Sequence, residues 1–124
     1  MWLTAMAFFA ATVDAEPKSP PAAEPVIITR PRWVKRPTGE DIARVYPDRA
    51  ARDGVDGRAA MDCMIKADGR LGDCKVMLEE PAGAGFGEAT LRLSTIFRMQ
   101  SKSSDGIETA GGRIRIPVRY MVPR

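Results

Sequence analysis

The residues that could do chemistry are few, because the chain of 124 residues contains no histidine and only two cysteines. Without histidine it cannot build a Ser-His-Asp or Cys-His nucleophile or a histidine-based zinc site. Two cysteines are too few for a four-thiolate metal centre. The glycines at 83–85 and 111–112 lack the sequence context of a phosphate-binding loop. We therefore expect a protein that is not an enzyme and takes no metal, cofactor or small-molecule substrate.

The two cysteines flank Asp68-Gly69, a dipeptide typical of a two-residue hairpin turn between apolar runs. The turn predicts two antiparallel strands within 57–79, with Cys63 directly opposite Cys74. The same register makes four further pairs: Ile65 with Gly72, Met61 with Val76, Ala59 with Leu78, and, on the polar face, Asp62 with Lys75. Cross-strand Cβ atoms lie about 4.5–5.5 Å apart, close to the reach of a disulfide. We predict a Cys63–Cys74 disulfide, and the alternative is two buried thiols.

Helical signals lie on both sides of the hairpin. Apolar residues recur at helical spacing through 86–99, which predicts an amphipathic helix laid on the apolar face of the hairpin. Ahead of the hairpin, Thr38 favours the start of a helix and Tyr46-Pro47 breaks it, and 48–52 favours a second helical turn. The polar, glycine-rich segment 100–112 is predicted to be a loop. The fold class is therefore α+β.

The last segment, 113–122, alternates strictly between two faces. Five of its residues are predicted to face the core: Ile114, Ile116, Val118, Tyr120 and Val122. The other five are predicted to face outward: Arg113, Arg115, Pro117, Arg119 and Met121. Because Pro117 has no backbone N–H, this strand should lie at the edge of the sheet. An edge strand is a template on which another chain can pair.

The N-terminal part of the chain differs from the rest in composition. Residues 1–13 form an uncharged, mostly apolar run that is too short to span a membrane and is followed by small residues. We predict a signal peptide over 1–15, cleaved before Glu16. Residues 16–39 are predicted to be a proline-rich, basic linker that lays Trp33 on a domain spanning 40–124. The net charge of +3 does not by itself indicate nucleic acid, and no nucleic-acid partner is predicted.

The order of these pieces resembles the C-terminal domain of the TonB family of energy transducers. The matching features are Tyr46-Pro47 with Ala50, Gly54 with Gly57, Asp68-Gly69-Arg70, Pro81 with Phe86 and Ala89, Phe97-Arg98-Met99, and the strand from Gly112 to Tyr120. The resemblance implies a periplasmic domain of a Gram-negative bacterium that binds extended segments of outer-membrane receptors or other envelope proteins beside its last strand. By position, the partner-binding residues would be those of 113–122, and the bound chain would add a strand.

Three alternatives stay open at this point. The chain could be a truncated full transducer for TonB-dependent outer-membrane transport, or a periplasmic regulatory or inhibitor protein. Nucleic-acid binding through 30–36 and the arginines of the last strand would be marked by a steep salt dependence. A weak homodimer is also left open, and the identity of the partner is not predicted.

Overall fold

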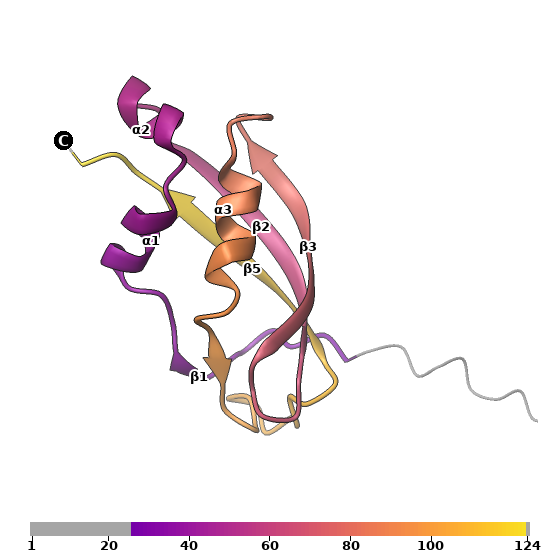
Figure 1. Cartoon of the computed structure of the whole chain (residues 1–124). Coiled ribbons are helices and arrows are strands. Elements are labelled where there is room, and N and C mark those ends of the chain that lie inside the picture. The colour runs from indigo at the N-terminus through magenta and orange to yellow at the C-terminus, as the bar shows by residue number, and fades with distance from the viewer. Residues whose placement is uncertain (1–25, 124) are drawn as a thin grey trace, which may run out of the picture.

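The computed structural model describes residues 26–123, and Figure 1 shows their arrangement. The predicted signal peptide and the first part of the predicted linker lie outside the described residues. In chain order the elements are β1 (Trp33–Lys35), α1 (Gly39–Val45), α2 (Asp48–Asp53), β2 (Gly57–Ile65), β3 (Leu71–Glu80), α3 (Phe86–Leu93), β4 (Arg98–Met99) and β5 (Arg113–Tyr120). Within this part of the chain no helix is long and apolar enough to cross a membrane.

The main sheet is antiparallel, with β2 in the centre and β3 and β5 at its two edges. The helix α3 lies across one face of this sheet, and α1 lies on the same side (Figure 1). The core fills the space between α3 and the sheet. Its fully buried large side chains are Tyr120, Phe86, Met61, Ile65 and Leu93. The α+β class and the edge position of the last strand are as predicted.

The start of α1 follows directly from the sequence. The side chain of Thr38 accepts a hydrogen bond from the Asp41 N–H at 3.2 Å, while Asp41 Oδ2 accepts from the Thr38 N–H at 2.8 Å. This reciprocal capping box pairs N–H groups that the first helical turn would otherwise leave unpaired. The Thr38 N–H and the Thr38 hydroxyl both donate to Asp41 Oδ2, and these two bonds lower the pKa of Asp41. The helix ends at the predicted Tyr46-Pro47 break, and α2 follows at once.

The third helix is shorter than predicted, since it ends at Leu93 and not at Met99. The hydroxyls of Ser94 and Thr95 donate to the carbonyls of Leu91 and Arg92. Such bonds let short polar side chains compete with the helical backbone pattern, which weakens the helix at this point. Beyond it, Arg98–Met99 pair with the N-terminal segment as β4, and a two-residue strand leaves no periodic signal in the sequence.

The hairpin has its turn at Asp68-Gly69, but the predicted register is correct only in the middle. Met61 pairs with Val76, and Asp62 pairs with Lys75, as predicted. The predicted pairs of Ile65 with Gly72 and of Ala59 with Leu78 are wrong: Ile65 pairs with Leu71, and Ala59 pairs with Glu79. The reason is that β3 carries two irregularities, one of them at Asp73, whose φ is 49°. An extra residue in one strand shifts every later pair by one.

The predicted linker packs on the domain from residue 26 onward. Trp33–Lys35 pair with β4, and the rings of Trp33 and Phe97 have centroids 4.9 Å apart, which places Trp33 on the domain as predicted. Upstream, Ile27 pairs with Arg113 in the parallel sense. The segment between these two pairings is held by bonds from Ser104 N–H to the Arg30 carbonyl and from Gln100 N–H to the Arg32 carbonyl. The N-terminal segment is therefore part of the folded surface beside β5.

Candidate functional site: the open edge of β5

The side chains of β5 follow the predicted alternation, although the strand ends at Tyr120 and not at Val122. Ile114, Ile116, Val118 and Tyr120 are buried, while Arg115, Pro117 and Arg119 are exposed. Met121 and Val122 lie beyond the strand, because the Val122 N–H turns to Asp56 Oδ1 at 2.8 Å and leaves the sheet. The exposed side chains of β5 therefore lie on the face of the sheet opposite α3.

At every second residue of β5, the backbone N–H and carbonyl groups point away from β2 toward the free edge of the sheet. On the inner side, the Ile65 N–H donates to the Gly112 carbonyl at 2.9 Å. On the outer side, the Arg113 N–H donates to the Val26 carbonyl and the Arg113 carbonyl accepts from the Ile28 N–H, both at 2.8 Å. Because hydrogen-bonding directions alternate along an antiparallel strand, the backbone groups of Arg115, Pro117 and Arg119 also point outward. Pro117 lacks an N–H there, as expected at an edge.

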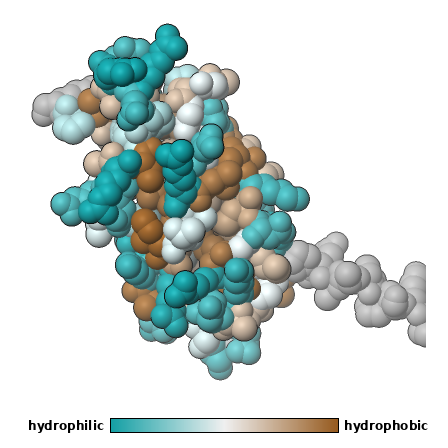
Figure 2. All heavy atoms as spheres, in the orientation of Figure 1, coloured by the Kyte–Doolittle hydropathy of each residue, from teal (hydrophilic) through white to brown (hydrophobic). Residues whose placement is uncertain are grey.

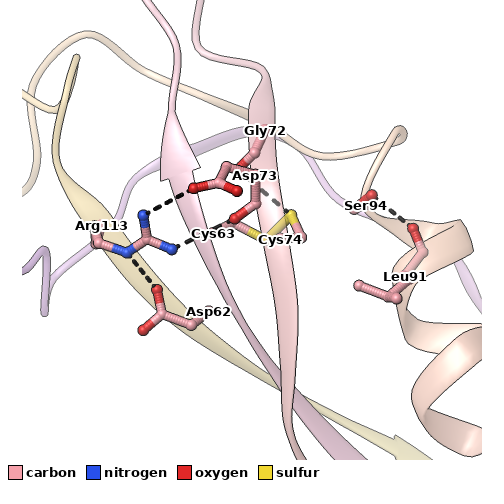
Figure 3. Close-up of a disulfide and its surroundings, with 8 residues drawn as sticks. All are labelled: Asp62, Cys63, Gly72, Asp73, Cys74, Leu91, Ser94 and Arg113. Carbon is pink, nitrogen blue, oxygen red and sulfur yellow. Dashed lines mark hydrogen bonds and ion pairs between the residues drawn. A yellow bond between two sulfur atoms is a disulfide. The ribbon is translucent and has the colours of Figure 1, made fainter.

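The side chain of Arg113 is already engaged within the domain (Figure 3). Its Nε lies 2.7 Å from Asp62 Oδ1 on β2, and one terminal nitrogen lies 3.5 Å from Asp73 Oδ2 on β3. The hydrogen bond to Asp62 raises the pKa of Arg113, and the two carboxylates add to the effect. Since its backbone is also paired, Arg113 differs from the other predicted partner-binding arginines: it ties the three strands together.

The two cysteines are joined as predicted, with Cα atoms 4.1 Å apart. Cys63 is fully buried and Cys74 half-buried, so the bond links the core of β2 to the edge strand β3 beside the irregularity at Asp73. Figure 3 shows Arg113 and Asp73 close to this link. The disulfide and the Arg113 ion pairs therefore hold the same end of the sheet.

A pocket of about 380 Å³ borders the open edge of β5. Its floor contains Ile114, Ile116 and Val118 of β5. Its apolar walls come from the N-terminal segment, α1, the end of α3 and the segment between α3 and β4, and they are Pro31, Trp33, Pro37, Ile42, Leu93 and Phe97. Figure 2 shows apolar residues exposed between hydrophilic ones on the face that carries α1 and α3. The pocket therefore lies on the α3 side of a strand whose outer backbone groups are open.

The charged residues that border this pocket are all basic: Arg36, together with Arg115 and Arg119, whose side chains start from the opposite face of the sheet edge. None of the three takes part in an ion pair of residues 26–123. Arg119 lies opposite Arg58 on β2, but Arg58 is bound to Glu80 with Nε and Oε1 2.6 Å apart. The open edge thus carries unpaired positive charge beside an apolar hollow.

This arrangement suits the binding of a chain and offers little for bond-making chemistry. The described residues contain no cluster of three or more metal-binding side chains. The neighbouring carboxylates Glu79 and Glu80 serve the fold. Glu79 Oε1 accepts from the Gly87 N–H at 3.1 Å at the start of α3, and Glu80 binds Arg58. Unpaired backbone groups next to a hydrophobic hollow are the features used to bind an extended peptide.

Part of the site was not found from the sequence. Trp33 was expected to rest on the domain, but β1 and its role as a pocket wall were not predicted. The available signal was the β-favouring run Val26-Ile27-Ile28 together with Trp33-Val34, which the surrounding prolines obscured. Ile42 and Arg36 were also missed as pocket residues, because their place depends on how α1 and the N-terminal segment fold back.

The comparisons with known proteins fit this geometry. A sequence profile described as Gram-negative bacterial TonB protein C-terminal matches residues 42–122. A protein of Caulobacter vibrioides, described as uncharacterized, is 34% identical over 64 residues, which cover 52% of this chain and 64% of that protein's length. The chain thus spans less than two thirds of that relative.

Two solved structures match the chain. The solution NMR structure of the Pseudomonas aeruginosa TonB C-terminal domain matches with a TM-score of 0.52 and 19% identity, covering 82% of this chain and 87% of the other. The TonB2 protein of Vibrio anguillarum matches with a TM-score of 0.48 and 21% identity over 100% of this chain and 96% of the other. The first of these shows the shared α+β fold.

The family match begins at Ile42, within α1, and ends at Val122, just beyond β5, and therefore includes the hairpin, α3 and the open edge. TonB C-terminal domains are periplasmic and are not enzymes. This agrees with the expectation that the chain carries no catalytic site. The chain belongs to the TonB C-terminal domain family of Gram-negative bacteria.

Proposed function

We propose that this protein is a periplasmic binding module that captures an extended segment of an outer-membrane receptor or another envelope protein by adding it as a strand to β5. The observation that carries the proposal is the open edge, where the backbone groups of Arg115 and Arg119 point away from β2 beside the apolar pocket. Main-chain bonds would supply affinity there, and pockets for alternate side chains would supply selectivity.

Two further observations support the compartment and the kind of partner. The Cys63–Cys74 disulfide suits an oxidising compartment such as the periplasm. Membership of the TonB C-terminal domain family points to outer-membrane receptors as partners. Export would use the signal peptide expected over residues 1–15.

The proposal is tested with overlapping peptides from the periplasm-facing segments of the outer-membrane receptors of the source organism. Binding is measured by calorimetry with the disulfide intact, using the parent protein, Arg119→Pro and Arg119→Ser. Both variants lose the guanidinium, but only the proline variant also loses the outward N–H. Pro117 shows that an outward position of this strand accepts proline.

The expected result is that at least one peptide binds the parent and the serine variant, and that Arg119→Pro weakens this binding about tenfold or more, because a main-chain bond is lost and its partner is left unpaired. Circular dichroism confirms that both variants are folded. Equal binding by the folded serine and proline variants would place the partner elsewhere on the surface and overturn the proposal.

A further inference from the structure

The two faces of β5 would contact different kinds of side chain on a strand that pairs with it. Ile116 and Val118 face the α3 side, where the apolar pocket lies, and Arg115, Pro117 and Arg119 face the opposite side. Side chains of an added strand alternate in step with those of the strand they pair with. The residues aligned with Ile116 and Val118 would therefore point to the pocket, and those aligned with Arg115 and Arg119 would lie beside the two guanidinium groups.

The length of the usable edge is also limited by the molecule itself. The Arg113 backbone is taken by Val26 and Ile28 of the N-terminal segment, so a partner finds no open group at that position. At the other end the strand stops at Tyr120, and the Val122 N–H is bonded to Asp56. The open positions that remain are Arg115, Pro117 and Arg119, which lie within the five consecutive residues 115–119.

The charges at this edge favour one kind of partner. Arg36, Arg115 and Arg119 line the pocket, no acidic side chain lines it, and no ion pair of residues 26–123 neutralises the three arginines. Asp62, the residue opposite Arg115 on β2, is bound to Arg113 with Nε and Oδ1 2.7 Å apart. Acidic side chains on a bound strand would meet positive charge that has no partner within the domain.

Resting on the proposed function, we propose that the bound segment has carboxylates at two positions four residues apart and apolar side chains at the two positions that directly flank the residue midway between them. The carboxylates pair with Arg115 and Arg119, and the apolar side chains enter the pocket beside Ile116 and Val118. The middle residue lies opposite Pro117, which offers only its carbonyl group. Because this pattern is symmetric about Pro117, it holds for a parallel or an antiparallel strand.

The test uses synthetic peptides, which cannot alter the fold of the protein. The probe contains Asp-Val-Thr-Val-Asp between short Gly-Ser flanks, with both ends blocked. A transposed peptide, Val-Asp-Thr-Asp-Val, has the same composition and net charge but exchanges the two faces. A neutral peptide, Asn-Val-Thr-Val-Asn, keeps the apolar pattern and removes the charge. Dissociation constants are measured by calorimetry at low and at physiological salt.

We expect the probe to bind about tenfold or more tightly than the transposed peptide, since exchanging the faces removes two apolar side chains from the pocket. The neutral peptide should bind about fivefold more weakly than the probe at low salt, and this difference should shrink as salt is added. In the variant Arg115→Ser with Arg119→Ser the charged and neutral peptides should bind equally. Arg52→Ser removes one exposed charge from α2, away from the pocket, and should keep the preference.

The outcomes separate this inference from the proposed function. If receptor-derived peptides bind in the manner that Arg119→Pro disrupts, but probe and transposed peptide bind equally or not at all, the pattern is wrong and strand addition on β5 stands. If the folded Arg119→Pro protein binds the receptor peptides as the parent does, the proposed function fails and this inference fails with it. A charge preference that persists in the double serine variant would also overturn the pattern.

Discussion

Tyr120, the last residue of β5, and Thr90 of α3 have their hydroxyl oxygens 2.8 Å apart inside the core. The Thr90 hydroxyl donates its only hydrogen to the Phe86 carbonyl at 2.8 Å, so the Tyr120 hydroxyl is the donor in the pair. The Tyr120 ring also lies 5.0 Å from that of Phe86 and 5.7 Å from that of Tyr46. Through Tyr120, the end of the proposed binding strand is fixed to the helix that covers the sheet.

Replacing Tyr120 with phenylalanine should lower the free energy of unfolding by about 1 kcal/mol, the typical contribution of one hydrogen bond. The aromatic contacts stay, and Thr90 keeps its bond to the Phe86 carbonyl. Urea unfolding of the parent and of Tyr120→Phe at neutral pH measures the difference. Thr90→Ser, which retains the hydroxyl, serves as the matched control; equal midpoints for the parent and Tyr120→Phe would contradict the role given to this bond.

Alkaline pH should act on the same residue. Burial raises the pKa of Tyr120 above its ordinary value of 10.0. The folded state therefore holds the phenolic proton more tightly than the unfolded state, and this contribution to stability is complete below the unfolded pKa. It is lost as the pH rises above about 10 and through the raised folded value. Unfolding measured at a series of pH values should show a steeper alkaline loss for the parent than for Tyr120→Phe.

The disulfide should be a major stabilising bond of this domain. Cys63 and Cys74 are 11 residues apart, and closing a loop of this length removes chain entropy from the unfolded state worth about 2–3 kcal/mol. Cys63→Ser and Cys74→Ser should each lower the melting temperature of the oxidised protein. With the parent reduced, all three proteins should melt at similar temperatures. Two free thiols in the unfolded, unreduced parent would show that the bond is absent.

The features predictable from the sequence are those that neighbouring residues determine. The Asp68-Gly69 turn, the Thr38 cap and the alternation from Ile114 to Tyr120 depend on local backbone preference and on a period of two, and all three are present. The edge position of β5 could be inferred because Pro117 lacks a donor. These signals are read within a few residues, so tertiary packing changed them little.

The features that could not be predicted depend on contacts between distant segments. The irregularity at Asp73 shifts the hairpin register, and its residue identity is no strong signal for one. The second irregularity pairs Leu78 with Ala60, which in turn pairs with the outward-facing Pro117, so Leu78 lies on the face away from α3 and is 36% exposed. The pocket depends on β1 returning to pair with β4, which places Trp33 and Pro37 near β5. No local sequence pattern marks either the irregularities of β3 or the return of β1 to β4.

The N-terminal residue of the mature protein tests the predicted export. If residues 1–15 are a signal peptide, mass spectrometry of the protein isolated from cells should show Glu16 as the first residue. The protein should be released with the periplasmic fraction. Recovery of the chain with Met1 from the soluble cytoplasmic fraction would contradict the prediction. Glu16 lies outside the described residues, so this experiment is independent of the fold.

The last prediction concerns what the two free arginines of β5 do. Charged residues on an edge strand sometimes have a purely protective role, which is to stop one sheet from pairing with another. Arg115 and Arg119 are exposed and have no ion pair among residues 26–123, and Arg119 faces the like charge of Arg58. Replacing both with serine should therefore leave the melting temperature unchanged, while the capture of acidic segments weakens.

Sedimentation of the double serine variant separates binding from protection. If the arginines orient a partner, the variant keeps the oligomeric state of the parent at equal concentration and loses affinity for its ligand. If they only protect the edge, the variant self-associates and binds its ligand as before. We expect the first result, because Pro117 already interrupts the row of donors at the centre of the edge and would oppose self-pairing without the charges. In the parent protein, Arg115 and Arg119 would then select the segment that pairs with β5.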